Sequence, residues 1–261
     1  MRVHVVSDVH GNVEGLARAV EGADAVFVLG DLIDFVDYAD PTAGILGRVL
    51  GADVSREFGR VRRSGGPGEL RAFAERAWAA IPDPAAVIAE AVDEQYARLF
   101  AVLPENTYAI PGNVDVPDRW PSVPRVTVPD GKVIEIGGLR VGFVGGVPLP
   151  DGFPPRPPGG PWRPHLLPAQ EYCAAVDAIT DIDVLCTHAP PEVPLLHYDR
   201  VTGRRELPGL GLRALIARER PRTALFGHVH QPLAQRARVG ATECVNVGHF
   251  RRTGQAYVLR W

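Results

Sequence analysis

Five short apolar segments, none longer than five residues, limit what this chain can fold into. Most of their residues are β-branched or aromatic, which favours buried strands over helices of the same length. Helix-like stretches lie between several of them, at residues 13–20, 169–179 and 212–218. Strand, helix and strand at this spacing predict α/β layering. The five segments are residues 3–6, 25–29, 107–110, 184–186 and 223–226.

The C-terminal half contains a second kind of pattern. Residues 132–136 and 140–144 flank Gly137-Gly138, which predicts a β-hairpin. Three further segments predict an antiparallel meander, and the whole pattern favours a mixed sheet or two packed sheets. These segments are residues 233–239, 243–247 and 255–259.

Two stretches interrupt this plan within what we expect to be a single domain over residues 1–261. Residues 40–104 carry Ala-rich helical patterns at 69–81 and 85–103, and predict a helical insertion. Residues 147–168 are rich in proline, which removes backbone donors and predicts a loop. The sequence leaves open whether these stretches are surface decoration or shape a substrate pocket.

Charge and cysteine content exclude several protein classes. The 28 Lys and Arg residues against 31 Asp and Glu give a net charge of -3, which argues against a dedicated nucleic-acid binder. The longest apolar runs fall far short of the roughly 20 residues of a membrane helix, and the first residues lack the features of a signal peptide. Three widely spaced cysteines without a CxxC motif indicate a reduced, cytoplasmic protein.

Polar side chains follow each of the five predicted strands where the strand ends. Loops at the carboxyl ends of such strands converge on one crevice, and carboxylate, carboxamide and imidazole groups suit a divalent metal. Seven ligands are too many for one tetrahedral ion but fit two ions that share a carboxylate. Glycines precede three of them and are expected to let the chain turn sharply. The seven are Asp8, His10, Asp31, Asn113, His188, His228 and His230.

Each short motif alone has an ordinary structural explanation. An Asp-x-His triplet is commonly a turn that caps a helix, and Gly-Asp and Gly-Asn are common turn sequences. The pair of imidazoles in Gly-His-x-His is the most specific of them. Five strand ends in a row with the right ligand types are not explained by five independent turns.

The ordered set of motifs resembles the calcineurin-like metallophosphoesterase superfamily, whose pattern is D-x-H, G-D, G-N-x-[D/E], H and G-H-x-H. The resemblance spans residues 3 to about 248 and implies a four-layer αββα sandwich of two mixed β-sheets flanked by helices, here with a helical insertion. The motifs stand at residues 8–10, 30–31, 112–115, 188 and 227–230.

The resemblance also implies how the ligands divide between two divalent transition metals, for which Mn, Fe or Zn would serve. Asp31 would bridge the two ions. One ion would be held by Asp8, His10 and His230, and the other by Asn113, His188 and His228. Such a site activates water and favours phosphate esters. We assign catalytic roles to Asp31, Asn113, His188, Asp34 and His249.

Departures from the family pattern narrow the expected activity. Val114 stands where many phosphatases of the superfamily have a histidine beside the leaving oxygen. Asp34, which pairs with that histidine in phosphoprotein phosphatases, is kept, whereas the arginine that follows it is Phe35. These differences argue against a phosphoserine/threonine phosphatase and favour the bacterial phosphodiesterase-like branches. Loop histidines that could supply the missing proton are His165, His197 and His249.

The leading interpretation is therefore a metal-dependent phosphodiesterase or phosphatase that acts on small molecules or nucleotides. A nuclease of the same superfamily is one alternative, and a cluster at Arg56, Arg60, Arg62 and Arg63 is its main support. A non-catalytic scaffold that uses the fold for protein interaction is the other. We expect a small-molecule phosphate ester as partner, neither nucleic acid nor membrane, and leave a homo-oligomer open.

Overall fold

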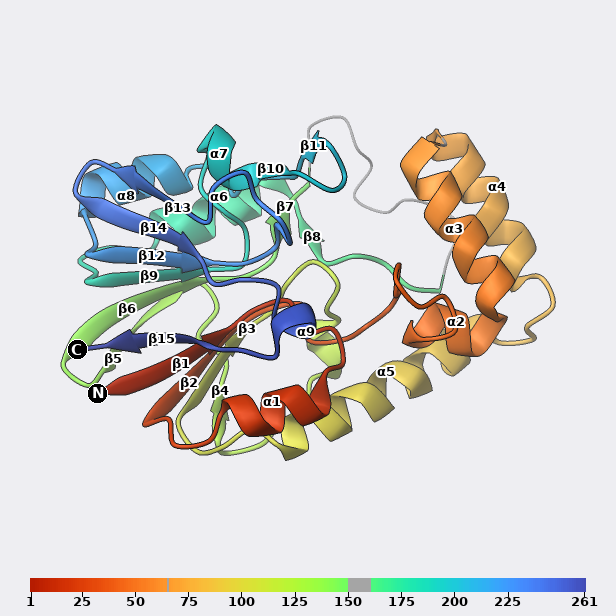
Figure 1. Cartoon of the computed structure of the whole chain (residues 1–261), viewed down its shortest axis with the longest axis horizontal. Helices are drawn as coiled ribbons and strands as arrows, with labels where there is room; N and C mark the ends of the chain where they lie inside the picture. The colour runs from red at the N-terminus through yellow and green to blue at the C-terminus, as the bar shows by residue number, and fades with distance from the viewer. Residues whose placement is uncertain (65, 150–160) are drawn as a thin grey trace.

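The computed structural model describes residues 1–64, 66–149 and 161–261, and its main strands form two mixed sheets that pack face to face (Figure 1). The first sheet has the order β15–β1–β2–β3–β4, with β1, β2, β3 and β4 parallel and β15 antiparallel to β1. Its strands are β1 (Arg2–Val6), β2 (Ala25–Leu29), β3 (Thr107–Ile110), β4 (Val126–Thr127) and β15 (Tyr257–Arg260).

The second sheet has the order β13–β14–β12–β9–β6–β5. Its four central strands are parallel, and each edge is an antiparallel pair. One of these pairs, β5–β6, is the predicted hairpin. The strands are β5 (Lys132–Ile136), β6 (Leu139–Val144), β9 (Val184–Thr187), β12 (Thr223–Phe226), β13 (Arg236–Val239) and β14 (Thr242–Asn246).

A layer of buried apolar side chains packs between the two sheets. Alternation along β2 sends Phe27 and Leu29 into this layer, whereas Val26 and Val28 face the outer side. The rings of Phe27 and Phe143 meet edge to face, with centroids 5.4 Å apart. Both faces of the central strands are buried, which explains why their sequences are almost continuously apolar.

Helices cover the outer face of each sheet and complete the predicted four-layer αββα sandwich, which the structure confirms (Figure 1). The first sheet is covered by α1 (Val13–Ala19) and α5 (Pro84–Ala101). The second is covered by α6 (Ala169–Asp177) and α8 (Leu212–Glu219). Helix α5 buries Ile88, Val92, Tyr96 and Leu99, whose spacing places them on one side of a helix.

Among the residues that the structure describes, four helices lie between β2 and β3, where the sequence predicts the insertion. They are α2 (Gly44–Leu50), α3 (Ala52–Ser64), α4 (Pro67–Trp78) and α5. The α3–α4 pair extends away from the sandwich, whereas α5 returns along the first sheet (Figure 1). Helix α5 begins where the Asp83 side chain accepts a hydrogen bond of 3.0 Å from the Ala86 N–H, with Pro84 at the first helical position.

The expected C-terminal meander is wrong in its last strand. Strands β13 and β14 pair antiparallel, but β15 crosses to the first sheet and pairs with β1. The crossing follows α9 (Phe250–Thr253), whose Phe250 N–H and Arg251 N–H bond to Ser7 O and Asp8 O. These bonds hold the chain beside β1 before β15 begins.

The predicted proline-rich loop is only partly within the described residues. Its ends form a parallel ladder between β7 (Val147–Pro148) and β8 (Leu166–Leu167), and residues 150–160 lie outside the description. Other short elements are η1 (Pro117–Arg119), α7 (Pro194–His197), β10 (Tyr198–Asp199) and β11 (Arg204–Arg205). In the described part of the chain, no helix has the length and apolar character that a bilayer crossing requires.

Candidate metal centre

The polar residues predicted from the sequence meet at one end of the sandwich, where β1, β2 and β3 of the first sheet and β9 and β12 of the second sheet end. Backbone hydrogen bonds tie these loops together. The Asp8 N–H donates to Gly30 O at 3.1 Å, and the Gly227 N–H donates to His188 O at 3.1 Å. The His228 N–H donates to Asp8 Oδ2 at 3.0 Å and thereby connects the loops of the two sheets.

Three glycines allow these loops to approach so closely. Gly30 has φ +90, as the expected sharp turn requires. Gly112 and Gly227 do not have a positive φ, so a turn is the wrong explanation for them. They are needed for space: a Cβ at Gly112 would lie 2.1 Å from Asp31 Oδ1, and one at Gly227 would lie 1.8 Å from the Ser7 Oγ.

Four of the predicted ligands have backbone conformations that non-glycine residues seldom adopt. Seven non-glycine residues in the described ranges have positive φ, and these four are among them. Such strain persists where the surrounding structure enforces it, and it gathers at functional sites. The four are Asp8 (φ +57), His10 (φ +42), Asp31 (φ +53) and His228 (φ +67).

Asp8, His10 and Asp31 bring ligand atoms within 4.8 Å of one another, in a first cluster that His230 adjoins. His10 Nε2 lies 3.2 Å from His230 Nε2, and His230 Nε2 lies 3.4 Å from Asp8 Oδ1. Asp31 Oδ2 lies 4.0 Å from His10 Nε2. Two imidazole nitrogens and two carboxylate oxygens thus face a common point.

A second cluster lies on the other side of Asp31. Ligand atoms of Asp31, His188 and His228 again lie within 4.8 Å of one another. His188 Nε2 is 3.6 Å from Asp31 Oδ1 and 3.1 Å from Asn113 Oδ1. Asp31 therefore directs Oδ1 toward one cluster and Oδ2 toward the other.

Hydrogen bonds behind the two clusters fix the orientation of two rings. His188 Nδ1 lies 2.7 Å from Leu29 O, and His10 Nδ1 lies 3.2 Å from Ile33 O. A carbonyl oxygen only accepts, so each Nδ1 carries the proton. The lone pair of each Nε2 then points into the cluster, which is the arrangement typical of metal-binding histidines.

Burial sets the charge of these groups. It lowers the pKa of both His10 and His228 to about 3, so each ring is neutral near pH 7. Burial raises the pKa of Asp31 to about 7, although His188 opposes the shift. Burial alone would raise the pKa of Asp8 as well, but the close approach of His230 and the other nearby imidazoles hold it below its usual range.

Two buried atoms of the clusters have no hydrogen-bond partner among the described residues: Asp8 Oδ1 and His228 Nε2. Unpartnered buried polar atoms are costly and rare. A carboxylate oxygen and an imidazole nitrogen are donors that Mn²⁺, Fe²⁺ and Zn²⁺ accept. The residues present therefore fit divalent transition metals.

Of the other two residues given catalytic roles, His249 lies at the first cluster, with its ligand atom within 4.8 Å of those of His10 and His230, whereas Asp34 lies outside both clusters. The His249 ring stacks on His230, with centroids 3.9 Å apart and planes 13° apart, and its buried Nε2 has no partner among the described residues. The Asp34 carboxylate instead faces Arg251, with Oδ2 3.1 Å from Nη1.

The other two loop histidines, His165 and His197, lie outside the two clusters. The His165 N–H donates to Asn113 O at 2.8 Å, so His165 adjoins the centre through its backbone. His197 is buried at the end of α7, where its Nδ1 lies 3.2 Å from Glu206 O. Neither ring is among the groups whose ligand atoms gather at the centre.

Asp115 supports the centre through hydrogen bonds that its sequence motif does not specify. Its buried carboxylate accepts hydrogen bonds from the Gly112 N–H at 2.8 Å, the Leu32 N–H at 3.0 Å and the Tyr96 hydroxyl at 3.1 Å. It thus joins the loops after β2 and β3 to helix α5. The motif G-N-x-[D/E] is the only sequence signal for it.

Arg251 is a second residue that sequence reasoning misses. It donates to His10 O and forms ion pairs with Asp34 and Asp37. It therefore braces the loop that carries His10. Its signal is weak, because an arginine in a short C-terminal helix has no distinguishing pattern.

Comparisons with known proteins agree with this geometry. Residues 1–232 match the family model described as calcineurin-like phosphoesterase. TT1561 of Thermus thermophilus is similar in structure, with a TM-score of 0.53 and 15% identity over 99% of this chain and 98% of that one. Another crystal structure gives a TM-score of 0.59 at 15% identity, with the same coverage. At this identity the two structures show the fold alone. No curated protein gave a significant sequence match.

Proposed function

The chain belongs to the calcineurin-like phosphoesterase family, and from that premise we propose that it is a dinuclear metal-dependent hydrolase of small-molecule phosphate esters. One observation carries the proposal: Asp31 stands between two clusters and directs one carboxylate oxygen to each. A shared carboxylate is what a pair of adjacent ions requires.

We propose that Asp8, His10 and His230 hold one divalent ion, that Asn113, His188 and His228 hold the other, and that Asp31 joins both. When bound, the two ions would supply Lewis acidity and lower the pKa of a water molecule. The chain would supply only two negative charges, Asp8 and Asp31, against a charge of +4, because imidazole and carboxamide groups bind metal ions in their neutral forms. The centre is thus left positive and attracts a phosphate ester.

The metal content of the protein tests this proposal directly. After mild loading with Mn²⁺ or Zn²⁺ and removal of free metal, elemental analysis should give close to two ions per chain. Asp53→Asn, which changes an exposed carboxylate on α3, should keep that number. A content of one ion or none in the wild type would contradict the dinuclear centre.

The substitution at Val114 predicts a preference among substrates. The side chain at this position has no proton to give to a departing oxygen, although the Val114 N–H donates to Asp31 Oδ1 at 2.8 Å. A missing acid catalyst typically costs about 10²–10⁴-fold for a poor leaving group and little for a good one.

Bis(p-nitrophenyl) phosphate should therefore have a kcat/KM at least about 10²-fold above that of glycerol phosphate. Steady-state kinetics with both substrates make the comparison. Equal values would mean that another residue supplies the proton, and His249, which stacks on His230, would then be replaced first.

The nuclease alternative has less support. The arginines that suggested it lie on α3, where Arg56 pairs with Asp53 and Arg60 with Glu57. Salt-sensitive cleavage of DNA would favour it over a small-molecule esterase. For the scaffold alternative, the retention of both clusters is the opposing observation.

The three free cysteines support our proposal of a reducing, cytoplasmic location.

A further inference from the structure

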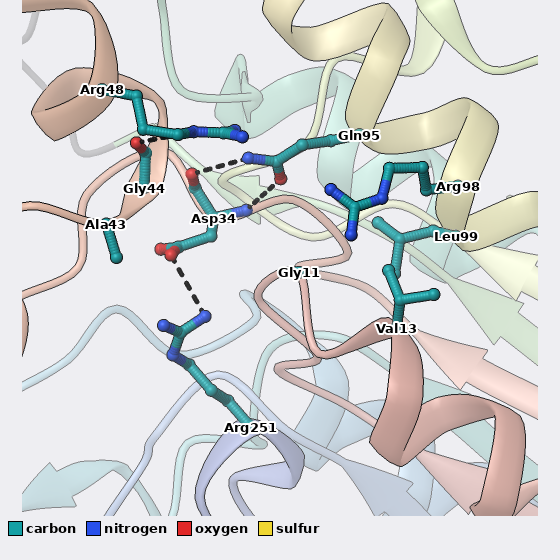
Figure 2. A pocket seen from close by; sticks show the side chains of 10 residues that line it. All are labelled: Gly11, Val13, Asp34, Ala43, Gly44, Arg48, Gln95, Arg98, Leu99 and Arg251. Atoms are coloured by element: carbon teal, nitrogen blue, oxygen red, sulfur yellow. Dashed lines mark hydrogen bonds and ion pairs between the residues drawn. The ribbon is translucent and has the colours of Figure 1, made fainter.

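A pocket of about 220 Å³ lies at the loop after β1 (Figure 2), which also carries the proposed metal ligand His10. Its walls come from segments far apart in the sequence: the loops after β1 and β2 and the helices α1, α2, α5 and α9. Gly11, the residue after His10, forms part of the lining. The apolar part comes from Val13 and Leu99.

Three arginines reach this pocket, from three different helices (Figure 2). Arg251 forms ion pairs with both Asp34 and Asp37, so these three groups together carry one negative charge. Arg48 of α2 also acts on the Asp34 carboxylate through its charge. With Arg48 and Arg98 of α5 included, the charged groups at the pocket sum to +1.

Arg48 and Arg98 have no carboxylate partner within the described ranges. Arg48 uses its Nε to donate to Gly44 O at 3.3 Å, which leaves both Nη groups without a described acceptor. No hydrogen bond or ion pair joins Arg98 to any described residue, and its guanidinium points to the pocket (Figure 2). Two like charges at one small pocket repel each other unless an anion lies there.

The wall between these arginines is held rigidly. The buried Gln95 side chain accepts from the Asp34 N–H at 2.8 Å and donates to Asp34 O at 3.2 Å, so both ends of its amide are used. The pocket is therefore preorganised and offers guanidinium donors at its sides. Planar guanidinium groups favour oxyanions that can accept two parallel hydrogen bonds.

We propose that this pocket binds a small oxyanion, a phosphate group, between Arg48 and Arg98, at a site separate from the metal centre. The phosphate is either free inorganic phosphate or a second phosphoryl group of the substrate. Because Arg251 bonds both Asp34 in the pocket wall and His10 O, the site adjoins the metal centre through one side chain.

Binding of inorganic phosphate to metal-free protein tests the site without any need for hydrolysis. In the presence of a chelator, isothermal titration calorimetry should show one phosphate per chain, and phosphate should raise the Tm of the wild type. Arg98→Gln and Arg48→Gln should each weaken binding by about tenfold or more, because each removes a charge-assisted contact.

Matched variants make the result specific. Arg213→Gln replaces an exposed arginine of α8, on the opposite outer layer, and should leave phosphate binding unchanged. Arg98→Lys should retain part of the affinity, because it keeps the charge. If the wild type binds no phosphate, or if Arg98→Gln and Arg48→Gln bind it as tightly as Arg213→Gln does, the proposal is wrong.

A second experiment, which rests on the proposed hydrolase activity, identifies the source of the phosphate. It compares kcat/KM for thymidine 5′-p-nitrophenyl phosphate with and without a 3′-phosphate. A preference for the 3′-phosphorylated compound that disappears in Arg98→Gln assigns the pocket to the substrate. Equal values in the wild type assign it to free phosphate. An inactive enzyme would contradict the proposed function and leave the calorimetric result intact.

Discussion

Asp31→Asn is expected to lower kcat/KM by about 10²–10³-fold and to reduce the metal content of the protein. The variant removes the one charge that faces both clusters, and several kcal/mol of transition-state stabilisation depend on such a centre. Asparagine keeps the size of the side chain and tolerates the left-handed backbone at this position, where φ is +53. Alanine would add strain there and confuse the result.

Asp8→Asn is the matched comparison for this experiment. Asp8 also has a positive φ, of +57, and is equally buried, but it belongs to the first cluster only. We therefore expect the smaller loss of activity from Asp8→Asn. Steady-state kinetics and elemental analysis on both variants make the measurement. Near-normal turnover of Asp31→Asn with Mn²⁺ present would show that Asp31 does not bridge.

Asp115→Ala is expected to lower the free energy of unfolding by about 3–9 kcal/mol, because three buried donors would each lose their acceptor at about 1–3 kcal/mol. That is a large part of the roughly 5–15 kcal/mol typical of a whole domain. Urea denaturation of the metal-free protein isolates this effect from metal binding.

Asp118→Ala provides the control for Asp115→Ala. Asp118 lies three residues further along the same segment but is less buried, so its replacement should change stability by less than about 0.5 kcal/mol. An Asp115→Ala protein as stable as Asp118→Ala would show that the carboxylate does not hold these loops together.

The alternation of strands and helices and the residues at the strand ends could be read from the sequence, because both depend on short-range patterns. The strand that ends before Asp8 is predictable from its own residues, and so is the helix that follows it. The convergence of Asp8 with His228 follows from the general rule on strand ends. These local regularities account for the fold class and for the proposed ligands.

What the sequence could not predict depends on contacts between distant segments. The position of β15 beside β1 depends on where helix α9 directs the chain. Residues 2 and 260 pair in the sheet although they lie near opposite ends of the sequence. The role of Asp115 depends on Tyr96, which belongs to the predicted insertion. The pairing of Asp34 with Arg251 likewise joins residues more than two hundred positions apart.

The helices of the inserted segment differ in their importance for protein engineering, because α5 supports the metal centre and the α3–α4 pair does not. Its Gln95 holds the Asp34 backbone and its Tyr96 holds Asp115, so a graft or deletion that spans all four helices removes supports of the metal centre. The α3–α4 pair extends away from the sandwich (Figure 1), and none of its described residues belongs to either cluster or lines the pocket. The modular boundaries in this chain thus lie inside the insertion, between α2 and α3 and between α4 and α5, because α2 contributes Arg48 to the pocket.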